Sequence, residues 1–265
     1  MIDHVTQLLR HAAAQAVLPR YQSLRAQDVL EKSPGELVTA ADREAESIIT
    51  EGLLRLLPGS VVLGEEAASA QVQVRDRLSH DGDLWLVDPL DGTANFVAGQ
   101  PCFSMMVALV RRGQTVAAWT LDPLADNIHI AEHGGGAWTD GTRVRAAPAA
   151  PSEQALRGAV FTRFLPAHLR DHVGARAHRI AAVLPGLRCA GHEYPAIATG
   201  AQHFALFWRA EAWDHAPGAL FLTEAGGRVA RLDGRGYVPT DVRPGLLAAQ
   251  NAAAWDAVER VLLST

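Results

Sequence analysis

The sequence is poor in cysteine and in aromatic residues, and this scarcity excludes several kinds of site. Only two of its 265 residues are cysteine, and aromatic residues make up 6% of the chain. Cys102 and Cys189 lie far apart and match neither a CxxC zinc motif nor a CxxC redox motif. Such sparse cysteine content fits a reducing compartment best.

The sequence also lacks long apolar runs and clusters of positive charge. No apolar stretch approaches the ~20 residues that a membrane-spanning helix needs, and Asp3 stands where a signal peptide needs basic residues. The formal charge is -5 and the sequence pI ≈ 6.1, with no basic run or stripe for nucleic acid. We therefore expect a cytoplasmic protein that binds neither nucleic acid nor a membrane.

The composition is otherwise that of a globular protein with a core. Hydrophobic residues make up 48% and charged residues 20% of the chain. The length allows one large domain or two closely packed halves. The only plausible seam is the Pro-Ala segment 148–151, which divides residues 1–147, with their antiparallel hairpins, from an α/β half at 148–265.

Periodicity and turn signals predict the elements of each half. Helices are expected over residues 2–16, 194–201 and 214–225, over a stretch that begins at Thr39 or Asp42 and ends at 57, over a helical stretch ending near 184, and at the C-terminus. Strands are expected over residues 61–63, 84–87, 104–110, 116–121, 128–131, 159–161 and 246–249 and near 229. The polar stretch between the first two of these strands is expected to be a loop.

The segment Asp88-Pro-Leu-Asp-Gly-Thr holds two carboxylates just after an apolar strand. The strand end and a proline turn would place Asp88 and Asp91 close together, and two unpaired carboxylates repel each other. A cation between them removes this cost, and hard oxygen ligands favour magnesium, manganese or calcium over zinc. Gly92 would let the N–H groups of a short helix from Thr93 approach phosphate. The plain alternative is a loop in which Asp91 caps that helix.

Two further acidic segments bring carboxylates from other parts of the chain. Gly64-Glu65-Glu66 follows a short apolar strand, so Glu65 could reach the same cations, although a solvated turn is the simpler interpretation of that segment alone. Asp214 stands where an N-cap belongs, with Pro217 in the first turn of a helix that Gly226-Gly227 ends. A well-capped helix explains this segment, but not the occurrence of all three in one chain.

Together these segments resemble the inositol monophosphatase family, part of the lithium-sensitive, magnesium-dependent phosphatases. The resemblance covers nearly the whole length, and the segments that carry it occur in the family's order. They are L-V-T-A-A-D at 37–42, G-E-E at 64–66, W-L-V-D-P-L-D-G-T-A-N-F at 85–96, the hairpin region 122–141, and W-D with E-A-G-G between 213 and 227. The resemblance implies a layered sandwich of the α+β or α/β class, with alternating helix and sheet layers, and commonly a homodimer.

The resemblance also implies the chemistry of a Mg²⁺-dependent phosphoric monoester hydrolase with two to three cations per site. Glu65, Asp88 and the Leu90 carbonyl would hold one Mg²⁺. Asp88, Asp91 and Asp214 would hold a second, and Glu65 would share a weaker third through water. The cations would neutralise phosphate and activate the attacking water. Mn²⁺ would be an alternative ion, whereas Ca²⁺ or Li⁺ would inhibit.

Further roles follow for the groups beside the cations. Glu65 and Thr93 would position the attacking water, and Asp42 would hydrogen-bond to Thr93. Asp91, Gly92 and Thr93 would bind the phosphate, the last two through their backbone N–H groups. No covalent phosphoenzyme is expected.

Residues 148–265 would supply the substrate pocket and the last metal ligand, but three positions depart from the family pattern. Glu193 stands where members often carry Asp or Asn, Phe207 where inositol-cleaving members use a glutamate, and His215 where an aliphatic residue is usual. We interpret His215 as a packing or positioning residue. The substrate is then an inositol-phosphate-like, sugar or polyol monophosphate, with histidinol phosphate or a nucleotide 3′-phosphate as alternatives.

Two other interpretations stay open. Asp-x-Asp-Gly-Thr of haloacid dehalogenase-type phosphatases is similar to the segment here, although this chain has two residues between the aspartates and carries the motif in mid-chain. A regulatory interaction protein on the same fold, with weak or no turnover, is the alternative from another class. The presence of all the expected ligands argues against it. The expected partner is a small phosphorylated metabolite.

Overall fold

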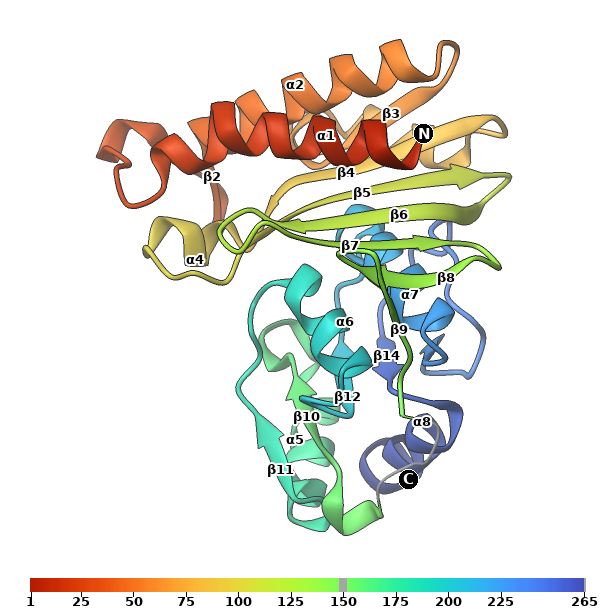
Figure 1. Cartoon of the computed structure of the whole chain (residues 1–265). Coiled ribbons are helices and arrows are strands. Elements are labelled where there is room, and N and C mark those ends of the chain that lie inside the picture. The colour runs from red at the N-terminus through yellow and green to blue at the C-terminus, as the bar shows by residue number, and fades with distance from the viewer. Residues whose placement is uncertain (148–151, 265) are drawn as a thin grey trace.

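Two long helices lie side by side at the N-terminal end of the computed structural model, which describes residues 1–147 and 152–264 (Figure 1). They are α1 (Ile2–Ala12), which continues in helical turns to Arg20, and α2 (Ala40–Leu56). Both were predicted. Within the described ranges, no helix is long and apolar enough to cross a membrane.

The start of α2 is fixed by a capping box, which also places Asp42 for the site. The Thr39 hydroxyl accepts a hydrogen bond from the N–H of Ala41, and the carboxylate of Asp42 accepts one from the N–H of Thr39. This exchange satisfies backbone donors that have no partner within the helix. Asp42 is therefore fully buried with a defined orientation.

The first sheet has seven strands in the order β3-β4-β5-β6-β7-β8-β9. β3 and β4 are parallel, and every other neighbouring pair is antiparallel. Arg112-Gly113 and Asp140-Gly141 make two-residue turns with positive φ, as tight hairpins require. The strands are β3 (Val61–Gly64), β4 (Asp83–Asp91), β5 (Ser104–Arg111), β6 (Gln114–Asp122), β7 (Asn127–Glu132), β8 (Gly136–Thr139) and β9 (Thr142–Val144).

The second sheet has five strands in the order β11-β10-β12-β14-β13, of which β11, β10 and β12 run parallel. The strands are β10 (Arg157–Val160), β11 (Ala182–Leu184), β12 (Phe204–Phe207), β13 (Arg228–Arg231) and β14 (Leu246–Ala249). The helices of this part are α5 (Ala167–Arg176), α6 (Ala190–Ala198), α7 (Ala212–Glu224) and α8 (Ala252–Val258), with a last turn at Glu259–Leu263. The expected seam at 148–151 lies outside the described residues, so the division into halves stays a prediction.

The elements form alternating layers of helix and sheet (Figure 1). α1 and α2 cover one face of the seven-stranded sheet, α6 and α7 lie between the two sheets, and α5 and α8 cover the far face of the five-stranded sheet. Side chains alternate accordingly: in β4, Trp85 packs with the α1–α2 layer and Leu86 with α7. The predicted layered sandwich is confirmed.

Several predictions of secondary structure were wrong because contacts with residues distant in the sequence determine these segments. The expected loop after β3 is helical, as α3 (Glu65–Ala70) and a 3₁₀ segment, Val72–Ser79. The stretch predicted as helix up to 184 ends in β11, which pairs with β10. The β1–β2 hairpin (Val29–Ser33, Glu36–Thr39) and β12 were not predicted.

Two corrections concern the acidic segments themselves. β4 does not end before Asp88 but continues to Asp91, and a bulge between them lets Pro89 sit where no ladder N–H is needed. The N-cap of α7 is Glu211, not Asp214, so Asp214 lies inside the first turn and Pro217 beyond it.

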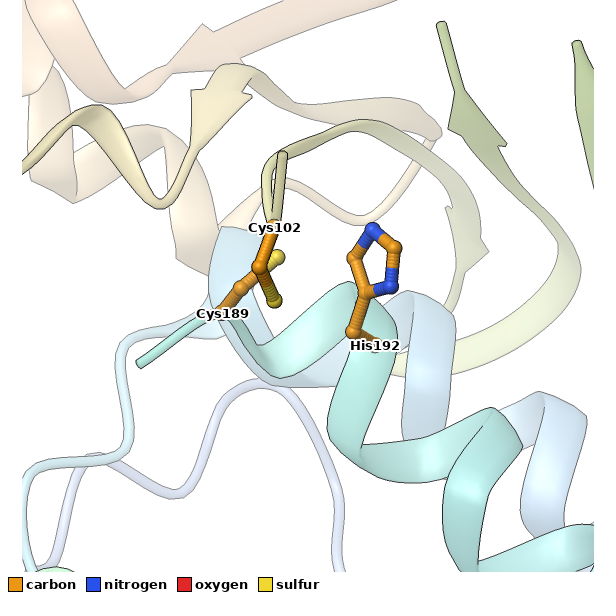
Figure 2. Close-up of side chains that lie close together, drawn as sticks. All are labelled: Cys102, Cys189 and His192. Carbon is orange, nitrogen blue, oxygen red and sulfur yellow. The ribbon is translucent and has the colours of Figure 1, made fainter. Parts of the chain in front are cut away.

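The segment before α6 packs directly against the loop before β5. Cys189, just before α6, lies beside Cys102 (Figure 2), and its sulfur is 3.5 Å from the Ser104 hydroxyl. The side-chain amide of Asn95 donates to the carbonyls of both Cys102, at 2.7 Å, and Leu187, at 2.9 Å. These contacts join the loop before β5 to the segment before α6, at the edge where the site lies.

Candidate metal and phosphate site

Three carboxylates from distant parts of the chain meet at the carboxyl ends of β3 and β4. Because β3 and β4 are parallel and in register from Val61 to Gly64, Glu65 emerges beside Asp88. Asp214 reaches the same place from the first turn of α7. One oxygen from each of the three lies within 4.8 Å of the others. The predicted convergence of these three residues is therefore present.

Asp91 and Gly92 complete this edge. Asp91 Oδ2 accepts the Gly191 N–H at 2.7 Å and lies 3.1 Å from the sulfur of Cys189. Gly92 has φ +84° and begins the short helix α4 (Thr93–Val97), as predicted. A Cβ at Gly92 would lie 2.9 Å from the Cys102 carbonyl oxygen, so only glycine fits this approach.

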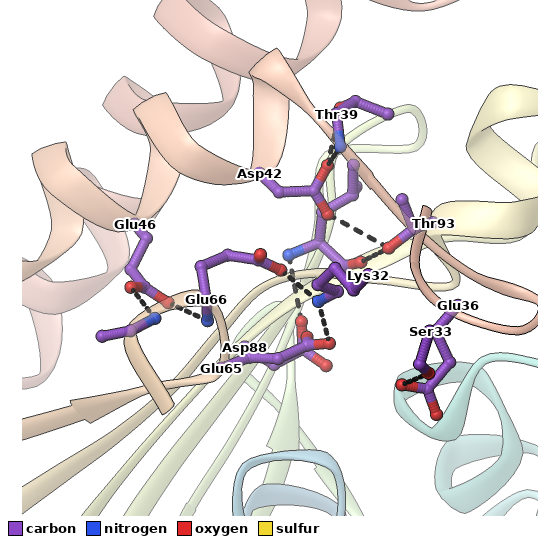
Figure 3. Close-up of polar contacts among 12 residues, drawn as sticks. Lys32, Ser33, Glu36, Thr39, Asp42, Glu46, Glu65, Glu66, Asp88 and Thr93 are labelled. Atoms are coloured by element: carbon purple, nitrogen blue, oxygen red, sulfur yellow. Dashed lines mark hydrogen bonds and ion pairs between the residues drawn. The ribbon is translucent and has the colours of Figure 1, made fainter. Parts of the chain in front are cut away.

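Thr93 links the edge to α2. Its hydroxyl lies 2.9 Å from the Leu90 carbonyl oxygen and 3.1 Å from Asp42 Oδ1. The hydrogen bond expected between Asp42 and Thr93 is therefore present (Figure 3). Burial raises the pKa of Asp42 to about 6, against hydrogen bonds from Thr39 that favour its charged form.

The crowding of carboxylates has a clear electrostatic consequence. Burial, followed by repulsion from Glu65, Asp91 and Asp214, raises the pKa of Asp88 well above its ordinary value. Burial and repulsion from Glu65 and Asp91 raise the pKa of Asp214 in the same way. A divalent cation bound by these oxygens would remove the repulsion, and all-oxygen ligands suit Mg²⁺. The donor set thus fits the metal that the resemblance implies.

Lys32, which the sequence analysis missed, lies at the centre of this cluster (Figure 3). Its Nζ is 2.9 Å from Glu65 Oε1 and 2.6 Å from Glu66 Oε1. Burial works against its charge, but the ion pairs with Glu65 and Glu66 outweigh burial and raise the pKa of Lys32. The sequence held one signal that could have identified it: Lys32 is the only lysine of the chain.

Glu46 is a second residue that the sequence analysis missed. Its carboxylate accepts the N–H groups of Glu66, at 2.8 Å, and Ala67, at 2.9 Å (Figure 3). It thereby satisfies donors in the first turn of α3, which has no side-chain cap of its own. Glu46 fixes the direction in which Glu65 leaves β3.

A cavity of ≈ 520 Å³ opens beside the carboxylates. Its lining combines the acidic residues and Lys32 with a set of rings and cations, which we call the second wall. The residues of that second wall are Phe161, Arg163, Phe164, Arg188, Phe207, Trp208, Arg209 and His215. Phe161 and Phe207 stack, with ring centroids 4.8 Å apart at an angle of 14°.

Of the three predicted pocket residues, two line the cavity and one does not. Phe207 and His215 do, and their rings are 4.7 Å apart. The prediction for Glu193 was wrong: it is fully buried, outside the cavity wall, and accepts hydrogen bonds from the Leu187 N–H and the Gln202 amide. The loop before α6 thus holds the Glu193 carboxylate in the first turn of that helix.

His215 is a packing residue in this arrangement, in line with its interpretation from the sequence. Its Nδ1 lies 2.9 Å from the Tyr194 hydroxyl. Burial lowers the pKa of His215 to about 3, so the ring is neutral at ordinary pH. The neutral ring of His215 packs against Phe207 and Tyr194 and so supports the cavity wall.

Proteins of similar sequence and fold identify the family of this chain. Residues 1–262 match the inositol monophosphatase family. The chain is 36% identical over 212 residues to an inositol-1-monophosphatase of Rhizobium meliloti, covering 77% of this chain and 76% of that one. It is 31% identical over 229 residues to Nus factor SuhB of Pseudomonas aeruginosa, covering 84% and 82%. The crystal structure of extragenic suppressor protein suhB from Bartonella henselae superimposes with a TM-score of 0.80 at 26% identity, covering 98% of each chain. The chain belongs to the inositol monophosphatase family and to its enzyme class, the phosphoric monoester hydrolases.

Proposed function

We propose that this protein is a Mg²⁺-dependent phosphatase that hydrolyses a small phosphorylated metabolite. The observation that carries the proposal is the convergence of Glu65, Asp88 and Asp214 within 4.8 Å at one wall of the cavity. Asp91 and the Leu90 carbonyl complete the donor set. When bound by these residues, Mg²⁺ neutralises phosphate charge and lowers the pKa of water.

The surrounding groups have distinct tasks in this proposal. Glu65 and Thr93 position the attacking water in line with the phosphate. Asp42 holds the Thr93 hydroxyl in place through their 3.1 Å contact. The N–H groups of Gly92 and Thr93 bind a phosphate oxygen, because no Cβ blocks the approach at Gly92. Water attacks phosphorus directly, and no residue becomes phosphorylated.

The second wall of the cavity selects the alcohol part of the substrate. The relative named inositol-1-monophosphatase supports a polyol, sugar or inositol-like monophosphate. The stacked pair Phe161–Phe207 favours a second candidate within the same chemistry, a monophosphate that carries a planar ring. Histidinol phosphate and nucleotide 3′-phosphates are such compounds. Arg163 and Arg188 offer positive charge to a further anionic group, whereas Arg209 already pairs with Glu36.

A phosphate-release screen tests this proposal. The metal-free protein is supplied with Mg²⁺ and a panel of inositol, sugar, histidinol and nucleotide monophosphates, with and without Li⁺. We expect Mg²⁺-dependent release from at least one compound, partial replacement of Mg²⁺ by Mn²⁺, and inhibition by Ca²⁺ and Li⁺. If phosphate is released from none of these compounds, the enzyme proposal is wrong.

The relative named Nus factor SuhB favours a second function, a regulatory binding role for the same fold. Asp91→Asn separates the two, because it keeps the shape of the side chain while removing the charge that holds a cation. An enzyme role loses turnover in this variant, whereas a binding role survives. We also propose that the protein is a homodimer, which analytical ultracentrifugation tests directly.

A further inference from the structure

A second group of side chains that could hold a metal lies beside Asp91. The sulfurs of Cys102 and Cys189 and one ring nitrogen of His192 lie within 4.8 Å of one another (Figure 2). Cys102 comes from the loop before β5, and Cys189 and His192 come from the start of α6. Cys189 is buried, and Cys102 is partly exposed.

We propose that Cys102, Cys189 and His192 form a site for a soft divalent cation of the Zn²⁺ kind, and that its occupancy inhibits the phosphatase. Thiolate and imidazole ligands select Zn²⁺ over Mg²⁺, whereas the oxygen ligands of the neighbouring site have the opposite preference. The two sites would therefore take different ions. Binding forms two sulfur–metal bonds and releases the two thiol protons, with no change of oxidation state.

The surroundings of His192 support this assignment. Its Nε2 lies 3.1 Å from the Phe103 carbonyl oxygen and 3.7 Å from Asp122 Oδ2. These contacts hold the ring beside the two sulfurs. A metal-binding histidine donates from one ring nitrogen to a carbonyl or carboxylate and binds the cation through the other, so a cation would take Nδ1, or Nε2 once it gives up the Phe103 contact.

Asp91 would supply the fourth ligand, and it would couple the two sites. Cys189 Sγ lies 3.1 Å from Asp91 Oδ2, so a cation bound to Cys189 reaches the Asp91 carboxylate as well. Zn²⁺ prefers four ligands in a tetrahedron, and Asp91 would complete it. The inhibition rests on the proposed function, in which Asp91 is a ligand for Mg²⁺. One carboxylate would then serve either site at the expense of the other.

Cobalt titration tests the site without relying on turnover. Co²⁺ is added to the reduced, metal-free protein, and the near-ultraviolet charge-transfer absorption of thiolate–cobalt bonds is followed. We expect saturation at one equivalent and loss of the absorption when Zn²⁺ is added. Oxygen ligands give no such absorption, so Co²⁺ at the phosphatase site does not interfere.

Variants identify the ligands. Cys102→Ala and His192→Asn should each weaken Co²⁺ binding by about tenfold or more, and the exposed His133→Asn serves as the matched control. Residue 102 contacts Asn95 through its backbone carbonyl, so Cys102→Ala leaves that contact intact. Cys102→Ser and a thermal melt show whether any loss reflects misfolding.

Inhibition is measured separately, at saturating Mg²⁺ with Zn²⁺ added in steps. Wild type should lose its phosphatase activity, and Cys102→Ala should keep the basal rate and resist Zn²⁺. No thiolate–cobalt absorption in wild type, or an unchanged absorption in Cys102→Ala, overturns the metal site. A Cys102–Cys189 disulfide that forms on air oxidation, with no cation bound after reduction, also overturns it. Cobalt binding without any phosphatase activity would instead refute the proposed function alone.

Discussion

The Nζ of Lys32 lies 2.9 Å from Oε1 of Glu65, so the only lysine of the chain pairs with a carboxylate that we assign to cation binding. Lys32 also pairs with Glu66 at 2.6 Å. Its ammonium partly neutralises a cluster of carboxylates. The same carboxylate of Glu65 would face both the ammonium and a bound cation.

Replacement of this lysine should therefore destabilise the metal-free protein. Lys32→Met leaves Glu65 and Glu66 without their positive partner, and because the pair is partly exposed we expect a loss of about 1–2 kcal/mol. Added Mg²⁺ should recover most of it. Thermal unfolding with and without Mg²⁺ measures both effects, and Lys32→Arg is the charge-retaining control. Equal melting temperatures for Lys32→Met and wild type without metal would contradict this account.

The metal-free protein should lose stability as the pH rises. The pKa values of Asp88 and Asp214 are raised in the folded state, so the folded protein binds more protons than the unfolded chain. Stability is then highest below the unfolded pKa and falls as the pH rises through the folded values. Other groups that titrate in this range also contribute to the change of stability with pH. The double variant Asp88→Asn/Asp214→Asn is therefore the control, and its stability should depend less on pH.

Magnesium should counteract this loss. A ligand that binds only the folded state at about 100 times its Kd adds about 2.7 kcal/mol of stability. The stabilisation should be larger at about pH 8 than at about pH 5, because protonated carboxylates bind cations poorly. Calorimetric melts at both values check this. Equal stabilisation at both would show that Mg²⁺ does not bind the clustered carboxylates.

Asp42 should control an acidic limb of the activity profile. Its pKa lies at about 6, and the charged carboxylate accepts at both oxygens, from the Thr93 hydroxyl at Oδ1 and from Thr39 at Oδ2. We expect kcat/KM to rise with pH through this region in wild type. Asp42→Asn should lower kcat by roughly 10²-fold and remove that limb. The exposed Asp126→Asn is the control, and an unchanged profile in Asp42→Asn would exclude the role.

Phe161→Leu tests the aromatic wall of the cavity. It removes one ring of the stacked pair while keeping an apolar side chain. For a planar-ring substrate we expect KM to rise about fivefold, corresponding to the ~1 kcal/mol of an aromatic contact. A polyol phosphate measured in parallel should be unaffected. Equal effects on both substrates would show a general packing defect instead.

The sequence alone was sufficient to predict the acidic segments and the convergence of Glu65, Asp88 and Asp214, because these residues follow or lie in strongly patterned elements. Apolar runs before Glu65 and Asp88 marked β3 and β4, and the parallel pairing of these strands then brings the two carboxylates together. Local signals also predicted the hairpins from β5 to β7. The helix containing Asp214 was predicted, although its first turn begins earlier.

Features set by distant partners could not be predicted in this way. β1, β2, β11 and β12 are short and gain their stability from neighbouring strands rather than from their own pattern. Lys32 lies on one of them, so its position at the site follows only from the tertiary structure. Glu193 was assigned to the pocket from its place in the sequence, but its carboxylate turns away to cap the loop at Leu187.

The central claim is tested most directly by comparing phosphate release by wild type and Asp88→Asn at saturating Mg²⁺, with Asp126→Asn as the surface control. Asp88→Asn removes one charge from the centre of the cluster and keeps the size of the side chain. We predict Mg²⁺-dependent release by wild type and Asp126→Asn, and a loss of roughly 10³-fold or more in Asp88→Asn. Release by Asp88→Asn at the wild-type rate would contradict a phosphatase that works through these carboxylates.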